Sequence, residues 1–325
     1  MLLLFLLWLA PLAHAGGDWE EFRNRFVAGD GRIVDTGQGG ISHSEGQGAG
    51  MLLAAAAGDH VSFDRIWEWT RRHLQVRDDE LLAWRWTPGE GVTDRNDATD
   101  GDLLVAWALL RAHQQWHVPD HLAAALGIAR NLREKALRPS AFGPLLLPGL
   151  TGFERAEGTV VNLSYWIFPA LRDIALADPS PEWEALRQSG LALLGASRFG
   201  RWQLPADWIV VDADKVAVAD GFPARFGYDA IRIPLYLHWA GLDSLERLQP
   251  YRDYWAFFDG ARFMPAWTKL TDDSVDSHGA SPGQHAVATL IGGGKSSPAA
   301  DPDEDYYSAQ LRLLCGLALF ASTHR

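Results

Sequence analysis

The sequence predicts a single all-α domain, and three observations support this fold class. Ten segments place apolar residues at helical spacing. Strand-like segments are few and do not alternate with the helical ones, as a parallel α/β sheet would require. The chain has no fixed-period repeat, and no linker rich in Pro and Ser divides it before residue 268.

The helical segments follow one another along the chain and are joined by loops. Residues 103–116 illustrate the pattern, because Leu103, Ala106, Trp107 and Leu110 fall on one face of a helix. In chain order, the predicted helices span residues 19–26, 48–57, 63–74, 103–116, 122–137, 165–176, 182–197, 232–239, 242–255 and 309–321.

Three segments depart from the helical pattern. Residues 209–211 and 216–218 are predicted to form a small hairpin across the turn at 212–215. Residues 83–86 are predicted to form a short extended segment. Residues 268–305 are polar and contain Gly, Ser, Pro and Asp throughout, so we predict a long loop over one end of the domain.

Composition and charge narrow the class of protein. The chain is 47% hydrophobic and 22% charged, as expected of a soluble globular protein. A net charge of -12 and the lack of a basic run argue against a nucleic-acid partner. The single cysteine, Cys315, lies in an apolar run and is predicted to be a small core residue. Most of the 15 tryptophans are expected in the core, and the others in a cleft.

The first residues have the pattern of a secretory signal peptide. Residues 1–9 are almost wholly apolar, and Ala13-His14-Ala15 forms a small-x-small cleavage site. We therefore predict a signal peptide at 1–15, a mature domain at 16–325 and a secreted or periplasmic protein. No Lys or Arg precedes the apolar stretch, so a buried N-terminal helix is the alternative. No other segment is long and apolar enough to insert stably in a membrane.

Three carboxylates stand at the heads of apolar helical runs, namely Glu45, Asp100 and Asp229. Ser44 and Gln47 fit a capping box, which would place Glu45 in a first helical turn. At any one of these sites, an acid that only complements the helix dipole is the simpler interpretation. If the fold brings the three helix starts to one end, the carboxylates meet in one cleft.

Two further features favour a functional cleft. Glycines at 46, 48 and 50 weaken a helix start, which suggests that something approaches the backbone closely there. Aromatic residues flank the acids, and an aromatic face can stack on a sugar ring. Paired carboxylates in such a cleft are the groups that cleave glycosidic bonds. The flanking aromatics are Trp84, Trp86, Tyr165, Trp166 and Tyr228.

The segment 98–116 resembles the signature of glycoside hydrolase family 8, with Val105 where Ile or Met is usual. Residues 44–54 resemble the family's acid-bearing motif, and residues 228–232 resemble its base-bearing motif. Residues 162–165 are similar to its Asn-Pro-Ser-Tyr motif, with Leu in the place of Pro, and residues 205–208 resemble a further element.

The resemblance runs in order from about residue 19 to the C-terminus. The compact length is similar to that of the periplasmic endoglucanases that accompany bacterial cellulose synthases. The resemblance implies an (α/α)6 barrel with a few short strands at the cleft end. It also implies an inverting endo-β-1,4-glucanase that needs no cofactor and no metal.

By the same resemblance, Glu45 is the general acid and Asp229 the general base that activates water. Asp100 binds and distorts the sugar at the cleavage point, and Tyr165 and Arg232 orient the water and the base. Trp84 and Tyr228 are added as candidates for substrate binding, with Trp84 and Tyr165 as stacking residues.

Physical chemistry sets conditions on these roles. Inversion requires that the carboxyls of Glu45 and Asp229 lie about 6.5–9.5 Å apart. Since a helix N-terminus lowers the pKa of Glu45, burial and Asp100 must raise it by more. Arg232, one turn after Asp229, is expected to keep Asp229 ionised.

Other chemistries match the sequence poorly. His113 and His117 have the spacing of a zinc pair, but the catalytic Glu of that motif is absent. The acidic residues at 301, 303, 304 and 305 lack the spacing of a calcium loop.

The predicted partner is a β-1,4-glucan polymer or oligosaccharide, and the protein is predicted to be a monomer. Chitosan, xylan or mixed-linkage glucan, and a non-catalytic glucan-binding module, are the alternatives.

Overall fold

The computed structural model describes residues 13–259, 263–294 and 301–324, and within them the protein is mostly helical. Eleven α-helices lie in these ranges. They are α1 (Ala13–Phe26), α2 (Ser44–Ala56), α3 (His60–His73), α4 (Thr99–Trp116), α5 (Pro119–Lys135), α6 (Phe168–Ala177), α7 (Pro181–Ala196), α8 (Arg232–Ala240), α9 (Leu245–Asp259), α10 (Pro282–Ile291) and α11 (Tyr306–Thr323).

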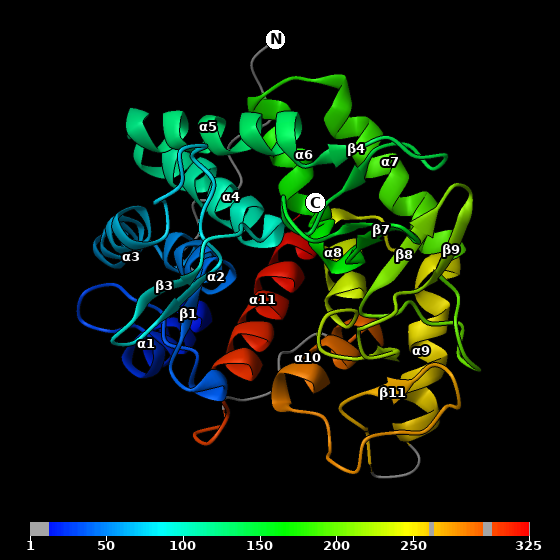
Figure 1. Ribbon diagram of the computed structural model, residues 1–325. Helices are drawn as coiled ribbons and strands as arrows, with labels where there is room; N and C mark the ends of the chain where they lie inside the picture. The colour runs from blue at the N-terminus through cyan, green and yellow to red at the C-terminus, as the bar shows by residue number, and fades with distance from the viewer. Residues whose placement is uncertain (1–12, 260–262, 295–300, 325) are drawn as a thin grey trace.

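The helices form an inner set and an outer set. Helix α2 packs against α4, α4 against α6, α6 against α8, and α8 against α10 and α11, while α11 returns to α2. Helices α1, α3, α5, α7 and α9 pack on the outside of this series. Figure 1 shows α11 crossing the centre of the molecule, between α2 and α8.

Ten of these helices match predicted segments, with ends shifted by a few residues. Helix α6 begins only at Phe168, because residues 163–165 form a short 3-10 turn that places Pro169 in the first turn of the helix. Helix α10 was missed, since it lies inside the predicted loop 268–305. The reason is local: Ser281 and Gln284 form a capping box that starts a short helix in a polar, Gly-rich context.

The predicted hairpin is confirmed and belongs to a larger sheet. Strands β8 (Ile209–Asp212) and β9 (Lys215–Val218) pair antiparallel, with Val210 opposite Ala217. They continue a four-stranded sheet of order β6-β7-β8-β9, in which β6 (Glu154–Arg155) and β7 (Gly158–Val161) precede them in the chain. Strand β7 leads directly into Asn162 and the 3-10 turn.

The predicted extended segment at 83–86 corresponds to β2 (Arg85–Thr87). This strand pairs with β1 (Ser42–His43) and β3 (Gly91–Asp94) in a small antiparallel sheet. Two further pairs are β4 (Leu137–Arg138) with β5 (Leu145–Leu146), and β10 (Arg225–Phe226) with β11 (Thr268–Lys269). Several of these strands lead into functional segments, since β1 runs into α2 and β10 lies just before Asp229.

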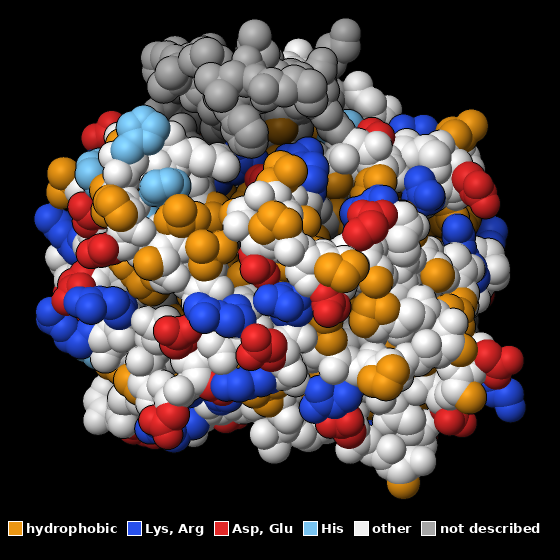
Figure 2. All heavy atoms as spheres, turned by 90° about the horizontal axis from the view of Figure 1, so that it is seen from above, with side chains coloured by type: hydrophobic (Ala, Val, Ile, Leu, Met, Phe, Trp, Pro, Cys, Tyr) orange, Lys and Arg blue, Asp and Glu red, His pale blue; other side chains and the backbone are white. Residues whose placement is uncertain are grey.

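The core contains most of the tryptophans, as predicted. Of the fourteen in the described residues, eight are buried, and Trp107 on α4 packs edge-on against Trp239 on α8 with ring centroids 4.9 Å apart. Cys315 is buried on α11, also as predicted. No helix of the described residues is long and apolar enough to cross a membrane. Over the face seen in Figure 2, acidic and basic side chains are interspersed.

Candidate active site

The starts of several inner helices meet at one place. Glu45 lies in the first turn of α2, Asp100 in the first turn of α4, and Arg232 is the first residue of α8. Asp229 lies three residues before Arg232, and Gln310 lies one turn into α11. The prediction that Glu45, Asp100 and Asp229 converge is therefore confirmed.

Arg232 joins the three carboxylates. Its Nη1 donates to Glu45 Oε1 at 2.6 Å and lies 3.5 Å from Asp100 Oδ2, while its Nη2 donates to Asp229 Oδ1 at 2.7 Å. Since the two nitrogens belong to one guanidinium, Glu45 Oε1 and Asp229 Oδ1 lie within about 8 Å of each other. Arg232 is only 4% exposed, so these contacts act in a medium that screens charge weakly.

One carboxylate oxygen of Glu45, Oε1, is held by hydrogen bonds, which leaves the other, Oε2, for catalysis. Besides Arg232, the amide Nε2 of Gln310 donates to Glu45 Oε1 at 3.1 Å. The hydroxyl of Tyr306 in turn binds Gln310 Oε1, which fixes the orientation of that amide. A proton on Glu45 therefore belongs on Oε2.

The pKa values of the acids differ from the sequence-based expectation. Burial alone would raise the pKa of Glu45, but Arg232, His43 and Gln310 together outweigh it, so this pKa lies below its usual value. The expectation of a raised pKa for Glu45 is wrong for the free enzyme, because the guanidinium contacts the carboxylate directly.

Among the three acids, Asp100 rather than Glu45 is the carboxyl that holds a proton. Burial and the neighbouring charge of Glu45 raise the pKa of Asp100 to about 7. Burial also raises the pKa of Asp229; Arg232 opposes this rise, and Glu45 adds to it. Arg232 thus favours ionised Asp229, as predicted, but it does not fully cancel the effect of burial.

The start of α2 is capped by His43 rather than by the predicted Ser44 capping box. His43 Nδ1 accepts from the backbone N–H of Gly46 at 3.0 Å, and its Nε2 lies 3.2 Å from Asp35 Oδ2. In this arrangement the ring carries its proton on Nε2 and donates it to Asp35. Gln47 points elsewhere, since its side chain accepts from the Ile33 N–H inside the core. His43 and Asp35 therefore fix the turn that carries Glu45.

Gly48 of α2 allows the close approach of α4. A Cβ on Gly48 would lie 2.6 Å from Leu104 Cβ and 2.8 Å from the Val105 nitrogen, both on α4. A Cβ on Gly101 of α4 would lie 2.7 Å from the Glu45 nitrogen. The close packing of α2 on α4 sets Glu45 beside Asp100.

Asp207 builds the turn that carries Asp229. Its Oδ1 accepts from the backbone N–H groups of Gly227 and Ala230, each at 2.9 Å, and from that of Asp229 at 3.3 Å. Arg225 Nε donates to the other oxygen at 2.9 Å. Asp207 is 1% exposed, so it holds the turn that carries the base Asp229 from inside the protein.

Aromatic side chains lie around the carboxylates. Tyr165 is half-buried, and burial together with the charges of Asp100 and Asp229 raises the pKa of its hydroxyl. Its role in orienting the water stays a prediction. Trp208 is edge-on to Tyr165, with centroids 6.0 Å apart, and stacks on Phe222 at 4.4 Å and 16°. These rings form one aromatic wall.

Trp84 and Tyr228 border the same region from two sides. The carbonyl of Trp84 accepts the N–H of Ser44 at 3.1 Å, which places this half-buried residue at the start of α2. Tyr228, 39% exposed, precedes Asp229, and its carbonyl accepts from the Tyr307 hydroxyl at 2.7 Å. Their proposed contact with substrate stays a prediction.

A cation in the middle of the acids would compete with Arg232, whose guanidinium already occupies that position. Within the described residues, no group of three or more His, Cys, Asp or Glu side chains is arranged so that it could hold a metal ion.

Sequence reasoning missed four residues of the site, and the signals differ. Asp207 lies in the segment 205–208, which resembles a family element, but no role was predicted for this residue. His43 preceded the predicted cap, but histidine is not a usual N-cap residue. Gln310 is a lone polar residue within an apolar run, a pattern that could have marked it, whereas Asp35 lies in a loop without any signal.

Comparison with known proteins agrees with this geometry. The profile of the glycosyl hydrolases family 8 matches residues 1–320. The chain belongs to this family. A probable endoglucanase of Novacetimonas hansenii is 40% identical to this family 8 protein over 306 residues, which cover 92% of this chain and 89% of the relative. The endoglucanase of Cellulomonas uda is 39% identical over 285 residues, covering 87% and 79%.

A solved structure is also similar to this family 8 protein. The endo-β-1,4-glucanase from Acetobacter xylinum superimposes with a TM-score of 0.92 at 40% identity, covering 97% of this chain and 100% of that one. The resemblance read from the motifs is thereby confirmed.

Proposed function

We propose that this family 8 protein is an inverting endo-β-1,4-glucanase with an (α/α)6 barrel. The observation that carries the proposal is the placement of Glu45 and Asp229 on the two terminal nitrogens of one buried guanidinium. The bound of about 8 Å between their oxygens includes separations that leave room for a water on the far side of the sugar ring. The ring of inner helices, closed from α2 round to α11, supports the barrel.

In the proposed reaction, Asp229 removes a proton from a water that attacks the anomeric carbon. Glu45 donates a proton from Oε2 to the glycosidic oxygen, and the bond to the leaving sugar breaks. Asp207 and Arg232 hold the base in position. Asp100 binds the sugar at the cleavage point.

The proton must reach Glu45 when substrate binds. In the free enzyme Arg232 keeps Glu45 ionised, while Asp100 holds a proton up to about pH 7. A sugar in the cleft excludes water and inserts between these groups, which weakens the contact of Arg232 with Glu45 and raises the pKa of Glu45. The three acids thus act as one coupled cluster.

Two supports point to β-1,4-glucan as the substrate. The relatives at about 40% identity are described as endoglucanases, and the solved structure as an endo-β-1,4-glucanase. The acid at Asp229 is retained, whereas branches of the family with other specificities often carry a different residue there. Chitosan, xylan and mixed-linkage glucan remain the alternatives to be tested.

The cellular setting is also a proposal. The apolar residues 1–9 and the Ala-His-Ala sequence support export to the periplasm or the medium, although residues 1–12 lie outside the described range. We propose that the mature protein acts there as a monomer, in cellulose biosynthesis or degradation.

The test is release of reducing ends from carboxymethylcellulose, chitosan and xylan by wild type, Asp229→Asn and Asp120→Asn. Asp120 is an exposed acid at the start of α5 and serves as the matched control. We expect wild type and Asp120→Asn to cleave carboxymethylcellulose and Asp229→Asn to lose this activity. Cleavage of chitosan or xylan alone would show that this polymer, and not β-1,4-glucan, is the substrate. If folded wild type cleaves none of the polymers, the non-catalytic glucan-binding module would be the remaining function.

A further inference from the structure

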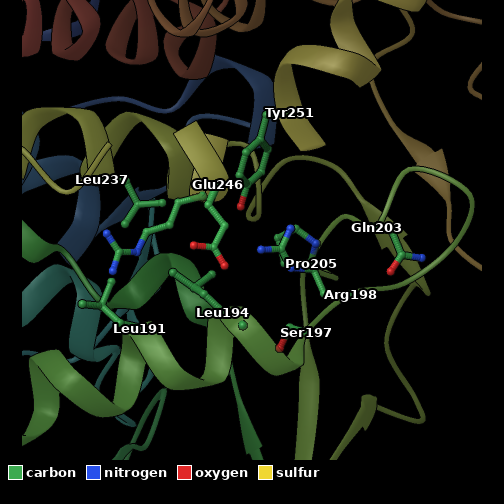
Figure 3. A pocket seen from close by; sticks show the side chains of 11 residues that line it. Leu191, Leu194, Ser197, Arg198, Gln203, Pro205, Leu237, Glu246 and Tyr251 are labelled. Carbon is green, nitrogen blue, oxygen red and sulfur yellow. The ribbon is translucent and has the colours of Figure 1, made fainter. Parts of the chain in front are cut away.

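A pocket outside the catalytic site lies between the ends of α7 and α8 and the first half of α9. Its volume is 170 Å³. Leu191 and Leu194 of α7 and Leu237 of α8 form apolar walls (Figure 3). The nearby residue Asp207 faces the catalytic turn, whereas Pro205, two residues earlier, lines this pocket. The pocket is therefore separate from the cleft that contains Glu45 and Asp229.

Three polar groups point into this pocket. Figure 3 shows the Glu246 carboxylate, the Tyr251 hydroxyl and the Arg198 guanidinium facing the same space. None of these side chains hydrogen-bonds or forms an ion pair with another described residue. Tyr251 is only 3% exposed, and its hydroxyl is the part of the side chain that faces the pocket. A hydroxyl that faces a pocket can donate to a ligand there and accept from it.

The pocket opens into a wider groove. The groove has a volume of 770 Å³, and Arg198, Gln203 and Glu246 line both spaces. Trp202, Gln249 and Asp253 line the groove further along. An enclosed space that continues into an open groove fits one terminal unit of a chain, with the following units along the groove.

The lining combines the carboxylate of Glu246 with the guanidiniums of Arg198 and Arg247, a mixture of acceptors and donors that suits a ligand with many hydroxyls. A sugar satisfies both signs, because its hydroxyls donate to the carboxylate and accept from the guanidinium. Its apolar C–H face fits the leucine walls, and the half-exposed Trp202 offers a ring edge for the next unit.

We propose that this pocket and groove form a second saccharide-binding site that holds the end of a β-1,4-glucan chain on the outer face of the enzyme. The proposal rests on the proposed function for its choice of glucan. A chain anchored here keeps polymer close to the enzyme between cleavage events, which raises its effective concentration at the cleft.

Calorimetric titration of Asp229→Asn with cellotetraose tests the proposal, since this variant is expected to bind but not cleave. We expect two binding events, one in the cleft and a weaker one in the pocket. Adding Glu246→Gln or Tyr251→Phe, both of which keep the shape of the side chain, should weaken the second event by about tenfold. Adding Glu134→Gln, an exposed glutamate on α5, should change neither event.

Each other outcome has a defined meaning. A single binding event in Asp229→Asn, or two events that Glu246→Gln and Tyr251→Phe leave unchanged, would overturn the outer site. Hydrolysis of cellotetraose by wild type is measured separately, and we expect Glu246→Gln and Tyr251→Phe to retain it. Absence of that hydrolysis would count against the proposed function, while binding sensitive to Glu246 would still support the site.

Discussion

Replacing Arg232 with methionine tests the electrostatic arrangement of the site. The side chain is 4% exposed and donates to Glu45 at 2.6 Å and to Asp229 at 2.7 Å, with Asp100 at 3.5 Å. Methionine fills much of the same volume without a charge, so the change leaves buried carboxylates without their cation.

We expect the free energy of unfolding at pH 7 to fall by about 3–5 kcal/mol, the usual cost of removing one partner of a buried ion pair. In wild type the folded pKa of Glu45 is lowered, so its contribution to stability is present above the unfolded pKa and is lost as pH falls through the folded pKa. Without Arg232, burial raises the folded pKa of Glu45, and its effect on stability reverses: protonation now favours the folded state.

The loss of stability should therefore be smaller at pH 5 than at pH 7. Each unit of pKa difference that is removed corresponds to about 1.4 kcal/mol. Urea unfolding of wild type and Arg232→Met at both values of pH measures this difference. Arg71→Met, which breaks only an exposed pair with Glu68, is the control and should leave the urea midpoint nearly unchanged at either pH.

Two results would refute this reasoning. One is an unchanged urea midpoint for Arg232→Met at pH 7, which would mean that the guanidinium does not hold the carboxylates. The other is an equal loss of stability at pH 5 and pH 7, which would mean that the effect comes from packing and not from charge.

Further predictions concern the packing and capping of the helices. Gly48→Ala places a methyl group against the α4 backbone and should lower stability by about 1–3 kcal/mol in urea unfolding. Gly316→Ala on α11 meets nothing within 4 Å and should be neutral or stabilising by up to about 1 kcal/mol. His43→Ala removes the cap on Gly46, and it should cost about 0.5–2 kcal/mol and lower kcat, whereas His43→Asn should restore much of the stability. Equal effects of the two glycine changes would contradict the close packing, and an unchanged kcat in His43→Ala would contradict the positioning role.

Sequence periodicity predicted most of the fold because the apolar stripes of ten helices are long and regular. Helix α10 was missed because its ten residues follow Ser and Gly residues that also favour a loop, and the capping contacts decide between the two. The short strands were partly missed, since two-residue strands such as β4 and β10 carry no periodic signal.

The carboxylates of the site could be predicted, but their electrostatics could not. The heads of three helical runs, together with the family resemblance, identified Glu45, Asp100 and Asp229. The direction of the pKa of Glu45 depends on Arg232, which is 187 residues away in sequence and contacts Glu45 only in the folded protein. The same holds for Gln310, which reaches Glu45 from 265 residues away.

The most direct test of the account is proton NMR of cellopentaose hydrolysis, recorded within the first turnovers. If Glu45 and Asp229 act as acid and base in a single displacement, the first new reducing ends are the α-anomer, which then equilibrates with the β-anomer. A first product with the β-anomer would mean retention through a covalent intermediate, and would contradict the role of Asp229 as a base that activates water.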